Sequence, residues 1–209
     1  MIKPYYQDEW VTIYHGDCRL ILPELPEVDL VLTDPPYGIN KDGQKVTTGG
    51  HGGRKGYEFL GWDNCRPDKE VFDLMLSKSK NQIIWGGNYF SDYLPPSGKW
   101  LVWDKGQRIN QSDGELAWTS YQGALRIFTL NRVELMLDHA NHPTQKPHKL
   151  IEWCITQTDA DSIIDPFMGS GTTLVSAKHL NRHCIGIEIE ERYCEIAAKR
   201  CSQSVMVLN

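Results

Sequence analysis

The sequence lacks the features that mark several classes of protein. It has no apolar run near the roughly 18–20 residues that a membrane-spanning helix needs. Residues 1–7 lack the apolar stretch of a signal peptide, so we expect a cytoplasmic protein. There is no internal repeat. A G-x-G-x-x-G motif near the first expected strand is also missing, which argues against a nicotinamide-dependent dehydrogenase.

The six cysteines show neither a C-x-x-C pair nor a compact cluster with histidine, so the sequence predicts no zinc site or other metal site. Without a secretory signal, these cysteines are more typical of reduced thiols than of disulfides. We expect most of them to be buried and structural. They are Cys18, Cys65, Cys154, Cys184, Cys194 and Cys201.

A surplus of positive charge, the usual mark of a nucleic-acid-binding protein, is absent. The formal net charge is −5. Residues 1–34 hold two basic and seven acidic side chains, so this segment accounts for the whole deficit. Residues 41–58 carry four basic side chains against two acidic ones. Charge alone therefore neither excludes nor establishes binding to DNA.

What the sequence does contain is an alternation of strand-like and helix-like patterns over 209 residues, a length that suits one α/β domain. The last quarter is the clearest part, because residues 162–201 read as a βαβα unit. Region 104–141 has no clear element apart from a strand near 116–118 or 124–129. The other strands are expected at 10–14, 28–33, 82–85, 100–103, 162–165 and 184–188, and helices at 19–22, 67–79, 150–156, 172–180 and 190–201.

Two turns about 130 residues apart each close an apolar strand at an acidic residue and a proline. The first, at 34–37, reads D-P-P-Y and follows the run 28–33. The second, at 165–173, reads D-P-F-M-G-S-G-T-T and follows residues 162–164. Ligands of open parallel sheets bind at the carboxyl ends of the strands. Both turns are therefore candidates for a ligand site.

A third motif, H-P-T-Q-K-P at 142–147, precedes the second turn and leads into an expected helix. In this order, the three motifs and a spaced acidic residue, Glu188, resemble the β class of the amino-group DNA methyltransferases, which modify N6 of adenine or N4 of cytosine. The resemblance covers nearly the whole chain except 41–60 and 104–140. It implies that residues 1–209 form a single Rossmann-like, S-adenosylmethionine-dependent methyltransferase domain. The sheet would be mostly parallel with helices on both faces, and the motif order circularly permuted, with the catalytic motif before the cofactor motif.

The second turn has the properties of a cofactor site. Its glycines let the backbone approach a ligand closely, and the helix that follows offers free N–H groups at its N-terminus. Glu188 ends the next strand 19 residues after Gly169, the spacing at which an acidic side chain accepts hydrogen bonds from ribose hydroxyls. The alternative is that Glu188 is simply an acid at the N-terminus of a helix.

The resemblance extends the cofactor site beyond this turn. It implies that Asp17 and Cys18 flank the adenine of the cofactor, although an Asx turn with Gly16 also explains Asp17. Lys146 could reach the cofactor carboxylate as a point charge. Pro147 suits the first position of a helix, so part of the third motif is also explained by capping. The residues expected to bind S-adenosyl-L-methionine are Asp17, Cys18, Asp34, Lys146, Phe167, Gly169, Ser170, Gly171, Thr172, Thr173 and Glu188.

The first turn suits chemistry on an exocyclic amino group, whose nitrogen is a poor nucleophile because its lone pair is delocalised into the ring. The Asp34 carboxylate and the Pro35 carbonyl can accept both amino hydrogens, and the two prolines fix the backbone that holds these acceptors. Tyr37 offers a ring for stacking on a base rotated out of the duplex. The alternative for D-P-P-Y alone is a rigid strand-to-loop turn. The residues expected to be catalytic are Asp34, Pro35, Pro36 and Tyr37.

Two segments are candidates for contact with DNA. Residues 38–61 hold eight of the 18 glycines and almost no apolar periodicity, which predicts a mobile loop after the catalytic turn. Residues 104–141 lie where the family that the chain resembles carries its target-recognition region, and they form a short candidate for that region here. The alternative in both segments is a passive polar loop. The residues expected to contact DNA are Lys41, Lys45, Arg54, Lys55, Lys105 and Arg108.

The leading hypothesis is methyl transfer from S-adenosylmethionine to N6 of adenine in duplex DNA, because D-P-P-Y is commoner among the adenine enzymes of the family. Cytosine N4 is the close alternative. RNA is a further candidate substrate, and a non-catalytic cofactor-binding partner subunit is a candidate of another class. The motif order disfavours a protein-amide methyltransferase. The short recognition region is compatible with help from a second copy of the chain, as a homodimer, or from a restriction-modification partner.

Overall fold

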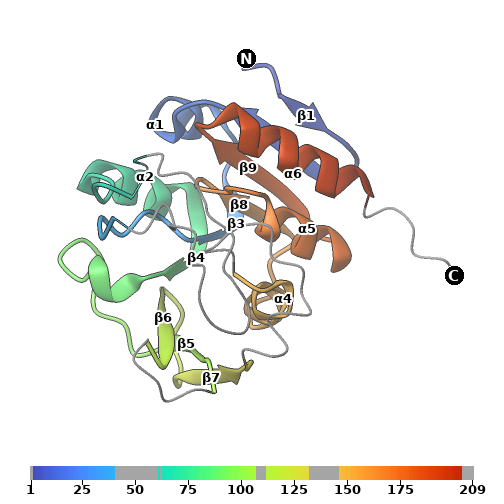
Figure 1. Ribbon diagram of the computed structural model, residues 1–209. Helices are drawn as coiled ribbons and strands as arrows, with labels where there is room; N and C mark the ends of the chain where they lie inside the picture. The colour runs from blue at the N-terminus through green and yellow to red at the C-terminus, as the bar shows by residue number, and fades with distance from the viewer. Residues whose placement is uncertain (1, 41–60, 62, 107–111, 132–145, 204–209) are drawn as a thin grey trace, which may run out of the picture.

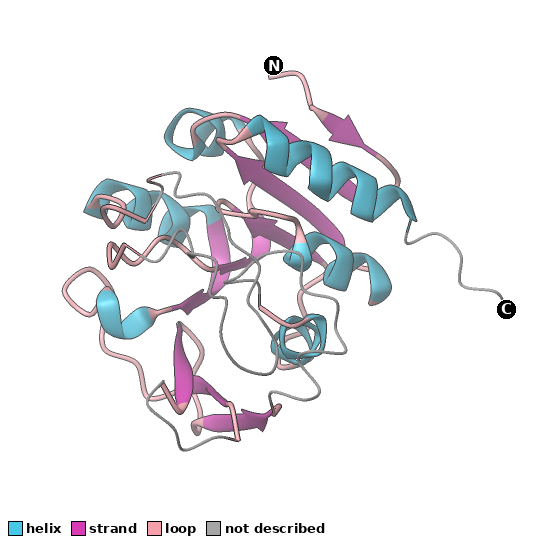
Figure 2. Ribbon diagram, viewed as in Figure 1, coloured by secondary structure: helices cyan, strands magenta, loops and turns pink. Residues whose placement is uncertain are grey.

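The computed structural model describes residues 2–40, 61, 63–106, 112–131 and 146–203. The strands are β1 Tyr6–Gln7, β2 Val11–His15, β3 Val28–Thr33, β4 Ser79–Trp85, β5 Trp100–Asp104, β6 Gly114–Thr119, β7 Arg126–Thr129, β8 Ser162–Asp165 and β9 His183–Glu188 (Figure 1). The helices are α1 Cys18–Ile21, α2 Lys69–Lys78, α4 His148–Thr156, α5 Thr172–His179 and α6 Glu191–Gln203 (Figure 2). Short 3-10 turns lie at Leu22–Glu24 and Gly87–Tyr89.

The strands form one mixed, mostly parallel sheet in the order β1-β2-β9-β8-β3-β4-β6-β5-β7. The five strands β2, β9, β8, β3 and β4 run parallel to one another. Strand β6 pairs antiparallel with both β4 and β5, and β1 pairs antiparallel with β2. The predictions of an α/β class and of a mostly parallel sheet are confirmed.

The two strands that end in the motif turns are direct neighbours at the middle of the sheet. Leu30 of β3 lies opposite Ile163 of β8, and Val31 lies opposite Ile164, in parallel register. Because both strands run the same way, their carboxyl ends emerge at the same edge. The sheet therefore brings residues 34 and 165 together although the chain separates them by about 130 positions.

Helices cover both faces of the sheet, as the sequence predicts, and each face has its own apolar core. On one face, α4, α5 and α6 pack on alternate sheet residues such as Leu30 and Leu32. On the other face, α1, the 3-10 turn that follows it, and α2 pack around Val31. Alternation of side chains along each central strand supplies both cores, which is why these strands read as nearly continuous apolar runs.

Helices α2 and α4 begin where local sequence signals favour a start. The α2 cap, Asp68, has extended backbone angles and follows a proline, and the apolar side of α2 buries Val71, Phe72 and Met75. Helix α4 begins after Pro147, whose extended conformation ends the preceding segment. Lys146 therefore stands just before α4, at the carboxyl edge of the sheet.

The predictions of secondary structure were least complete for the strands on the far side of β4, outside the five parallel central strands. Region 104–141, which offered one uncertain strand, holds both β6 and β7 among its described residues. Strand β6 gains its order from two partners, β4 and β5, which a local pattern does not reveal. Strand β7 is a largely exposed edge strand without a clear alternation. The two-residue β1 was not predicted either.

The cysteine prediction is confirmed, because all six are free thiols and only Cys65 is exposed. Over the described part of the chain, no helix combines the length and the apolar character needed to cross a bilayer. The described residues also contain no group of three or more His, Cys, Asp or Glu side chains arranged to hold a metal ion.

Candidate active site

A cavity of about 970 Å³ opens at the carboxyl ends of β3, β4, β8 and β9. Both motif turns line it, as does Lys146 from the segment before α4. Glu115 of β6 and Lys105, just after β5, line it from the antiparallel part of the sheet. This volume is within the range of pockets that bind small molecules and cofactors.

The backbone of the first turn is held by a residue outside every motif. Asp63 accepts hydrogen bonds from the Tyr37 N–H at 2.7 Å and from the Gly38 N–H at 2.9 Å. It is only 3% exposed and lines the cavity. No sequence signal pointed to Asp63, because it follows the glycine-rich segment and belongs to no regular pattern.

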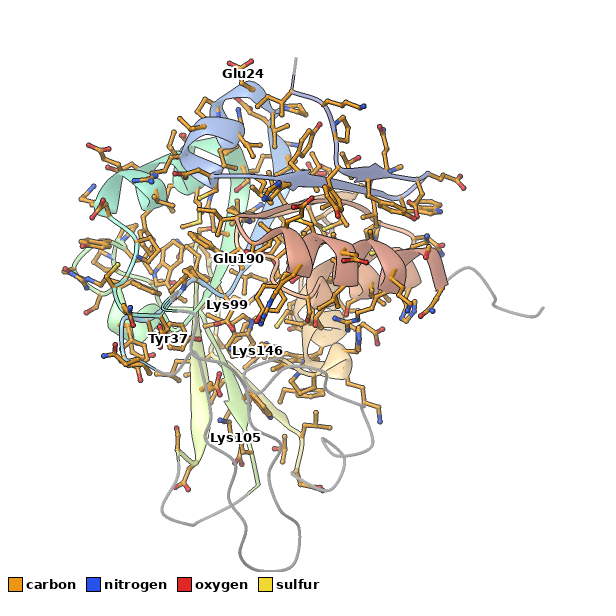
Figure 3. All side chains as sticks on the ribbon, turned by 45° about the horizontal axis from the view of Figure 1, so that its top comes forward. Glu24, Tyr37, Lys99, Lys105, Lys146 and Glu190 are labelled. Atoms are coloured by element: carbon orange, nitrogen blue, oxygen red, sulfur yellow. The ribbon has the colours of Figure 1, made fainter. Side chains whose placement is uncertain are left out.

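Both carboxylate oxygens of Asp34 are engaged in the structure. The Tyr37 hydroxyl donates to Oδ1. The Lys146 Nζ donates to Oδ2 at 2.5 Å and also contacts the Tyr37 hydroxyl oxygen at 3.3 Å. Figure 3 shows Tyr37 and Lys146 close together near the centre of the molecule.

Lys146 joins Asp34 to a chain of alternating charges, which we call the charge chain and define as Asp34, Lys146, Glu115 and Lys105. Lys146 Nζ lies 3.0 Å from Glu115 Oε2, and Lys105 Nζ lies 2.6 Å from Glu115 Oε1. The Lys146 side chain is only 8% exposed. The chain contains two cations and two anions, so its formal charges cancel. Neither Glu115 nor the pairing of Lys105 with it was predicted.

The environment sets the protonation of this chain. Burial acts to raise the pKa of Glu115, but Lys146 and Lys105 outweigh it and lower that pKa to about 2. Burial also acts to lower the pKa of Lys146, but the neighbouring Asp34 and Glu115 hold it well above its usual value. Desolvation raises the pKa of Asp34, with Lys146 opposing the shift. Lys146 is therefore a cation between two carboxyl groups.

An aromatic pair forms one wall beside Asp34. The rings of Tyr37 and Tyr89 stack with centroids 4.8 Å apart and an interplanar angle of 14°. Gly86 has a φ of 69° and lies so close that an added Cβ would come within 2.1 Å of Tyr37 Cε1. Only glycine fits there without moving the ring. The sequence predicted Tyr37 in this site but not Tyr89.

The glycine turn and Glu188 build the opposite side of the cavity. Glu188 Oε2 accepts from the Gly169 N–H at 2.9 Å, and Oε1 accepts from the Glu190 N–H at 2.9 Å. Burial raises the pKa of Glu188, while these backbone donors oppose the shift. Glu188 thus lines the cavity and also anchors the segment that enters α6, and its predicted contact with ribose hydroxyls stays a prediction.

Helix α6 fixes the glycine turn from outside the cavity. Arg200 donates to the Ser170 carbonyl oxygen at 2.5 Å and to the Ser170 hydroxyl at 3.0 Å. An added Cβ at Gly171 would lie 2.7 Å from the Ala197 Cβ, so Gly171 permits close packing of the turn on α6. At Gly169, by contrast, an added Cβ would meet nothing within 4 Å. The open space beside this turn is therefore next to Gly169 and not next to Gly171.

A buried carboxyl links the two turns. Thr33 donates to Asp165 Oδ1 at 2.7 Å, and the Phe167 N–H donates to the same oxygen at 3.1 Å. Burial raises the pKa of Asp165 to about 6, although hydrogen bonds from Thr173, Thr33 and Phe167 oppose the shift. Asp165 therefore lines the cavity between the carboxyl ends of β3 and β8.

The raised pKa of Asp165 predicts a pH dependence of stability. The folded protein binds more protons at this group than the unfolded chain, so the free energy of unfolding falls as pH rises from about 4 to about 6. We expect Asp165→Asn to flatten this fall by up to about 3 kcal/mol across the window. Urea unfolding at several pH values measures the difference in slope. Asp161→Asn, whose parent side chain is 78% exposed, is the control, and equal slopes in wild type and Asp165→Asn would contradict the assignment.

The structure gathers most of the residues that the sequence singled out. Asp17 instead caps α1 and pairs with Arg19, Cys18 is buried at the start of that helix, and neither is among the described residues that line the cavity. Their contact with a cofactor stays a prediction, and Gly171 packs on α6 as described above. The predicted residues that line the cavity are Asp34, Pro35, Pro36, Tyr37, Lys105, Lys146, Phe167, Gly169, Ser170, Thr172, Thr173 and Glu188. Lys41, Lys45, Arg54, Lys55 and Arg108 lie outside the described residues.

Comparison with known proteins adds a family and several relatives. A family model described as DNA methylase matches residues 74–199. The type II methyltransferase M2.DpnII of Streptococcus pneumoniae is 30% identical over 254 aligned positions, covering 96% of this chain and 92% of that protein. The type II methyltransferase M.HinfI of Haemophilus influenzae is 27% identical, covering 96% of this chain and 70% of that protein.

Solved structures share the fold. The crystal structure of the M1.HpyAVI–SAM complex has 24% sequence identity and a TM-score of 0.59, covering 91% of this chain and 99% of that one. The PvuII DNA methyltransferase, described as cytosine-N4-specific, has 18% identity and a TM-score of 0.64, covering 95% of this chain and 89% of that one. At these identities the likeness establishes the α/β architecture alone.

Proposed function

The chain belongs to the N6/N4 amino-DNA methylase family, and on that premise we propose that it methylates N6 of adenine in duplex DNA. The observation that carries the proposal is the shared cavity, where the Asp34 carboxylate and the glycine turn lie on adjacent parallel strands. The order of these turns along the chain supports the β class of the family. Adenine is favoured because the first turn reads D-P-P-Y.

The cofactor is S-adenosyl-L-methionine, which supplies an electrophilic methyl group on a sulfonium sulfur. The residues present fit this guest. The open space at Gly169 leaves room for a ligand against the backbone, and Phe167 and Glu188 line the same end of the cavity. Glu188 uses one lone pair of each oxygen on a backbone N–H, so each oxygen keeps a further acceptor position for ribose hydroxyls.

We assign the first turn to the target amino group. Asp34 and the Pro35 carbonyl accept its two hydrogens, which favours a pyramidal nitrogen with its lone pair free for attack. As the nitrogen lone pair forms the new N–C bond, the bond from the methyl carbon to the sulfonium sulfur would break and leave its electron pair on sulfur. The Asp34 carboxylate would stabilise the positive charge on the nitrogen electrostatically, and one amino proton would then be lost to solvent. The rigid D-P-P turn and the Asp63 hydrogen bonds preorganise these acceptors, so little rearrangement is needed at the moment of reaction.

The Tyr37–Tyr89 pair is proposed as the aromatic wall for the rotated base. Tyr37 also has a second role, because its ring stacks on Tyr89 while its hydroxyl donates to Asp34. Tyr37→Phe keeps the ring but removes one donor to Asp34. We expect turnover to fall about tenfold with DNA affinity nearly unchanged, since a hydrogen bond to a charged group is worth roughly 1.5–3 kcal/mol. Tyr37→Ala should lower both turnover and DNA affinity, because it also removes the ring.

Single-turnover rates and fluorescence anisotropy with duplex DNA measure these two effects separately. Tyr14→Phe on β2, away from the cavity, serves as a matched control. Wild-type turnover in Tyr37→Phe would show that the hydroxyl bond to Asp34 has no part in the reaction.

One experiment tests the proposed function directly. The protein is incubated with labelled S-adenosylmethionine and unmodified duplex DNA, and the DNA is then digested to nucleosides for mass spectrometry. The expected labelled product is N6-methyl-2′-deoxyadenosine. Labelled N4-methyldeoxycytidine would establish the alternative target base, and labelling only in a parallel RNA sample would replace DNA as the substrate. No transfer to any nucleic acid would overturn the proposal.

Contact with DNA through Lys41, Lys45, Arg54, Lys55, Lys105 and Arg108 remains part of this proposal. For Lys105 the pairing with Glu115 implies that phosphate contact would compete with an existing ion pair. A homodimer or a restriction-modification partner would supply additional recognition surface, and sedimentation of the protein with and without DNA tests the first of these.

A further inference from the structure

The engagement of Asp34 raises a question for the proposed reaction, on which this inference rests. The Tyr37 hydroxyl occupies Oδ1 and the Lys146 ammonium occupies Oδ2. A target amino group that donates to Asp34 must share or displace one of these partners. Lys146 is the partner that matters electrostatically, because its positive charge opposes the charge that develops on the amino nitrogen.

Displacing a buried ammonium is costly unless another acceptor receives it. The Lys146 side chain is only 8% exposed, so water cannot fully replace the lost carboxylate. Its surroundings also include the rings of Tyr37 and Trp85, whose centroids lie 5.7 Å and 5.5 Å from Nζ. These rings attract a cation only weakly compared with a carboxylate.

Glu115 is such an acceptor, and it is already in place. Its Oε2 lies 3.0 Å from Lys146 Nζ, whereas Asp34 Oδ2 lies 2.5 Å from the same nitrogen. Glu115 is itself held by Lys105 at 2.6 Å and by the pairing of β6 with β5, where it lies opposite Trp103. Both carboxylates therefore lie within ion-pair distance of the Lys146 ammonium, and Glu115 can keep it paired if Asp34 takes another partner.

We propose that Glu115 is a positioning residue for methyl transfer, which holds the Lys146 ammonium when the target amino group takes its place on Asp34. Before the target enters, Lys146 and Tyr37 keep the Asp34 carboxylate oriented. Once the target is bound, Glu115 offsets the charge of Lys146, so the field at the amino nitrogen is dominated by the Asp34 carboxylate. The formal charges of the charge chain still cancel when the target binds, because the amine that enters is neutral.

Glu115→Gln is the direct test, because it keeps the size of the side chain and removes its charge. We expect the single-turnover rate of methyl transfer to fall roughly ten- to a hundredfold, with S-adenosylmethionine affinity within about twofold of wild type. The reason is that Lys146 would remain on Asp34, since the neutral amide of the variant is a weaker alternative partner than a carboxylate. A loss in cofactor affinity without a loss in rate would overturn the proposal.

The pH profile of the rate provides a readout that a merely structural residue would not change. The charged and titratable groups around Asp34 are Lys146, Tyr37, Glu115 and Asp165. Glu115 is one of the groups that raise the pKa of Asp34, so its neutralisation should shift the acidic limb of the rate profile to lower pH. A profile of Glu115→Gln that superimposes on that of wild type would contradict the proposed coupling.

Two further variants complete the design. Glu115→Asp keeps the charge with a shorter reach and should restore part of the rate and the wild-type acidic limb, which also covers the case in which Glu115→Gln fails to fold. Glu152→Gln removes a partly exposed glutamate that pairs with His179 outside the cavity, and should leave rate and profile unchanged. A Glu115→Asp variant that is as slow as Glu115→Gln and shares its profile would overturn the charge-based role. Wild-type rates in every variant would overturn this inference while methylated DNA still upheld the proposed function.

Discussion

Asp34→Ala is expected to abolish methyl transfer, lowering the single-turnover rate by roughly a thousandfold or more. The lost carboxylate is the group proposed to orient the amino nitrogen and to stabilise the positive charge that forms on it. Asp34→Asn should be nearly as slow, because a neutral amide cannot stabilise that charge. Cofactor affinity should stay within about tenfold, since the lost interaction belongs mainly to the target amine.

The charge chain explains why this variant should still fold. Removing one partner of a buried ion pair is usually destabilising by several kcal/mol, because the other charge is left alone. Here Lys146 retains Glu115 at 3.0 Å, so the remaining cation keeps a carboxylate. The measurement compares single-turnover transfer with calorimetric binding of S-adenosylmethionine. Asp68→Asn, at an exposed helix cap that forms no side-chain capping bond, is the control, and near-normal turnover in Asp34→Ala would remove Asp34 from the mechanism.

Gly169→Val should reduce S-adenosylmethionine affinity by roughly a hundredfold. The φ of Gly169 is +50°, a conformation that a β-branched residue adopts only with strain. The space beside it is open in the structure, so the added side chain would project into the volume assigned to the cofactor rather than clash with the protein. In Gly169→Val, the free energy of S-adenosylmethionine binding should therefore change more than the free energy of unfolding.

Glu188→Ala should act on the same affinity through lost hydrogen bonds. Losing a charged acceptor for a ribose hydroxyl costs roughly 1.5–3 kcal/mol, or about ten- to a hundredfold. The variant also releases the Gly169 and Glu190 N–H groups, which loosens the turn itself. Calorimetry with the folded variants measures both predictions. Gly98→Val, where an added Cβ approaches only the Gly123 carbonyl oxygen at 3.9 Å, is the matched control, and unchanged affinity in Gly169→Val or Glu188→Ala would refute the cofactor assignment.

The parts of the site that the sequence predicted are those determined by local signals. A strand that ends at an acidic residue and a proline has a definite end, and the glycines of the second turn permit a backbone that few other residues allow. Asp34 and Gly169 could be recognised for this reason. Their mutual proximity follows from the pairing of β3 with β8, which the structure shows and which no local pattern in the sequence predicted.

The residues that the sequence missed depend on contacts between distant segments. Asp63 acts through backbone groups 25 and 26 residues away. Glu115 reaches Lys146 because β6 inserts between β4 and β5, an arrangement that strand propensity does not encode. Its sequence context, G-E-L-A-W-T, shows a strand with one charge and gives no hint that this charge lines a cavity. Asp17 differs from both, because its side chain bonds within its own helix cap in the structure, while its predicted contact with a cofactor stays a prediction.

Because β3 pairs with β8, the distance between the two motif turns does not depend on the length of the segments that connect them. Neighbouring strands lie about 4.8 Å apart whatever the chain does between them, and the Thr33–Asp165 hydrogen bond ties their ends. The alignment with M2.DpnII runs to 254 positions against a chain of 209 residues, so that relative carries extra residues somewhere along it. Changes in the length of the connections therefore leave the distance between the ends of β3 and β8 unchanged, because the interstrand spacing fixes it.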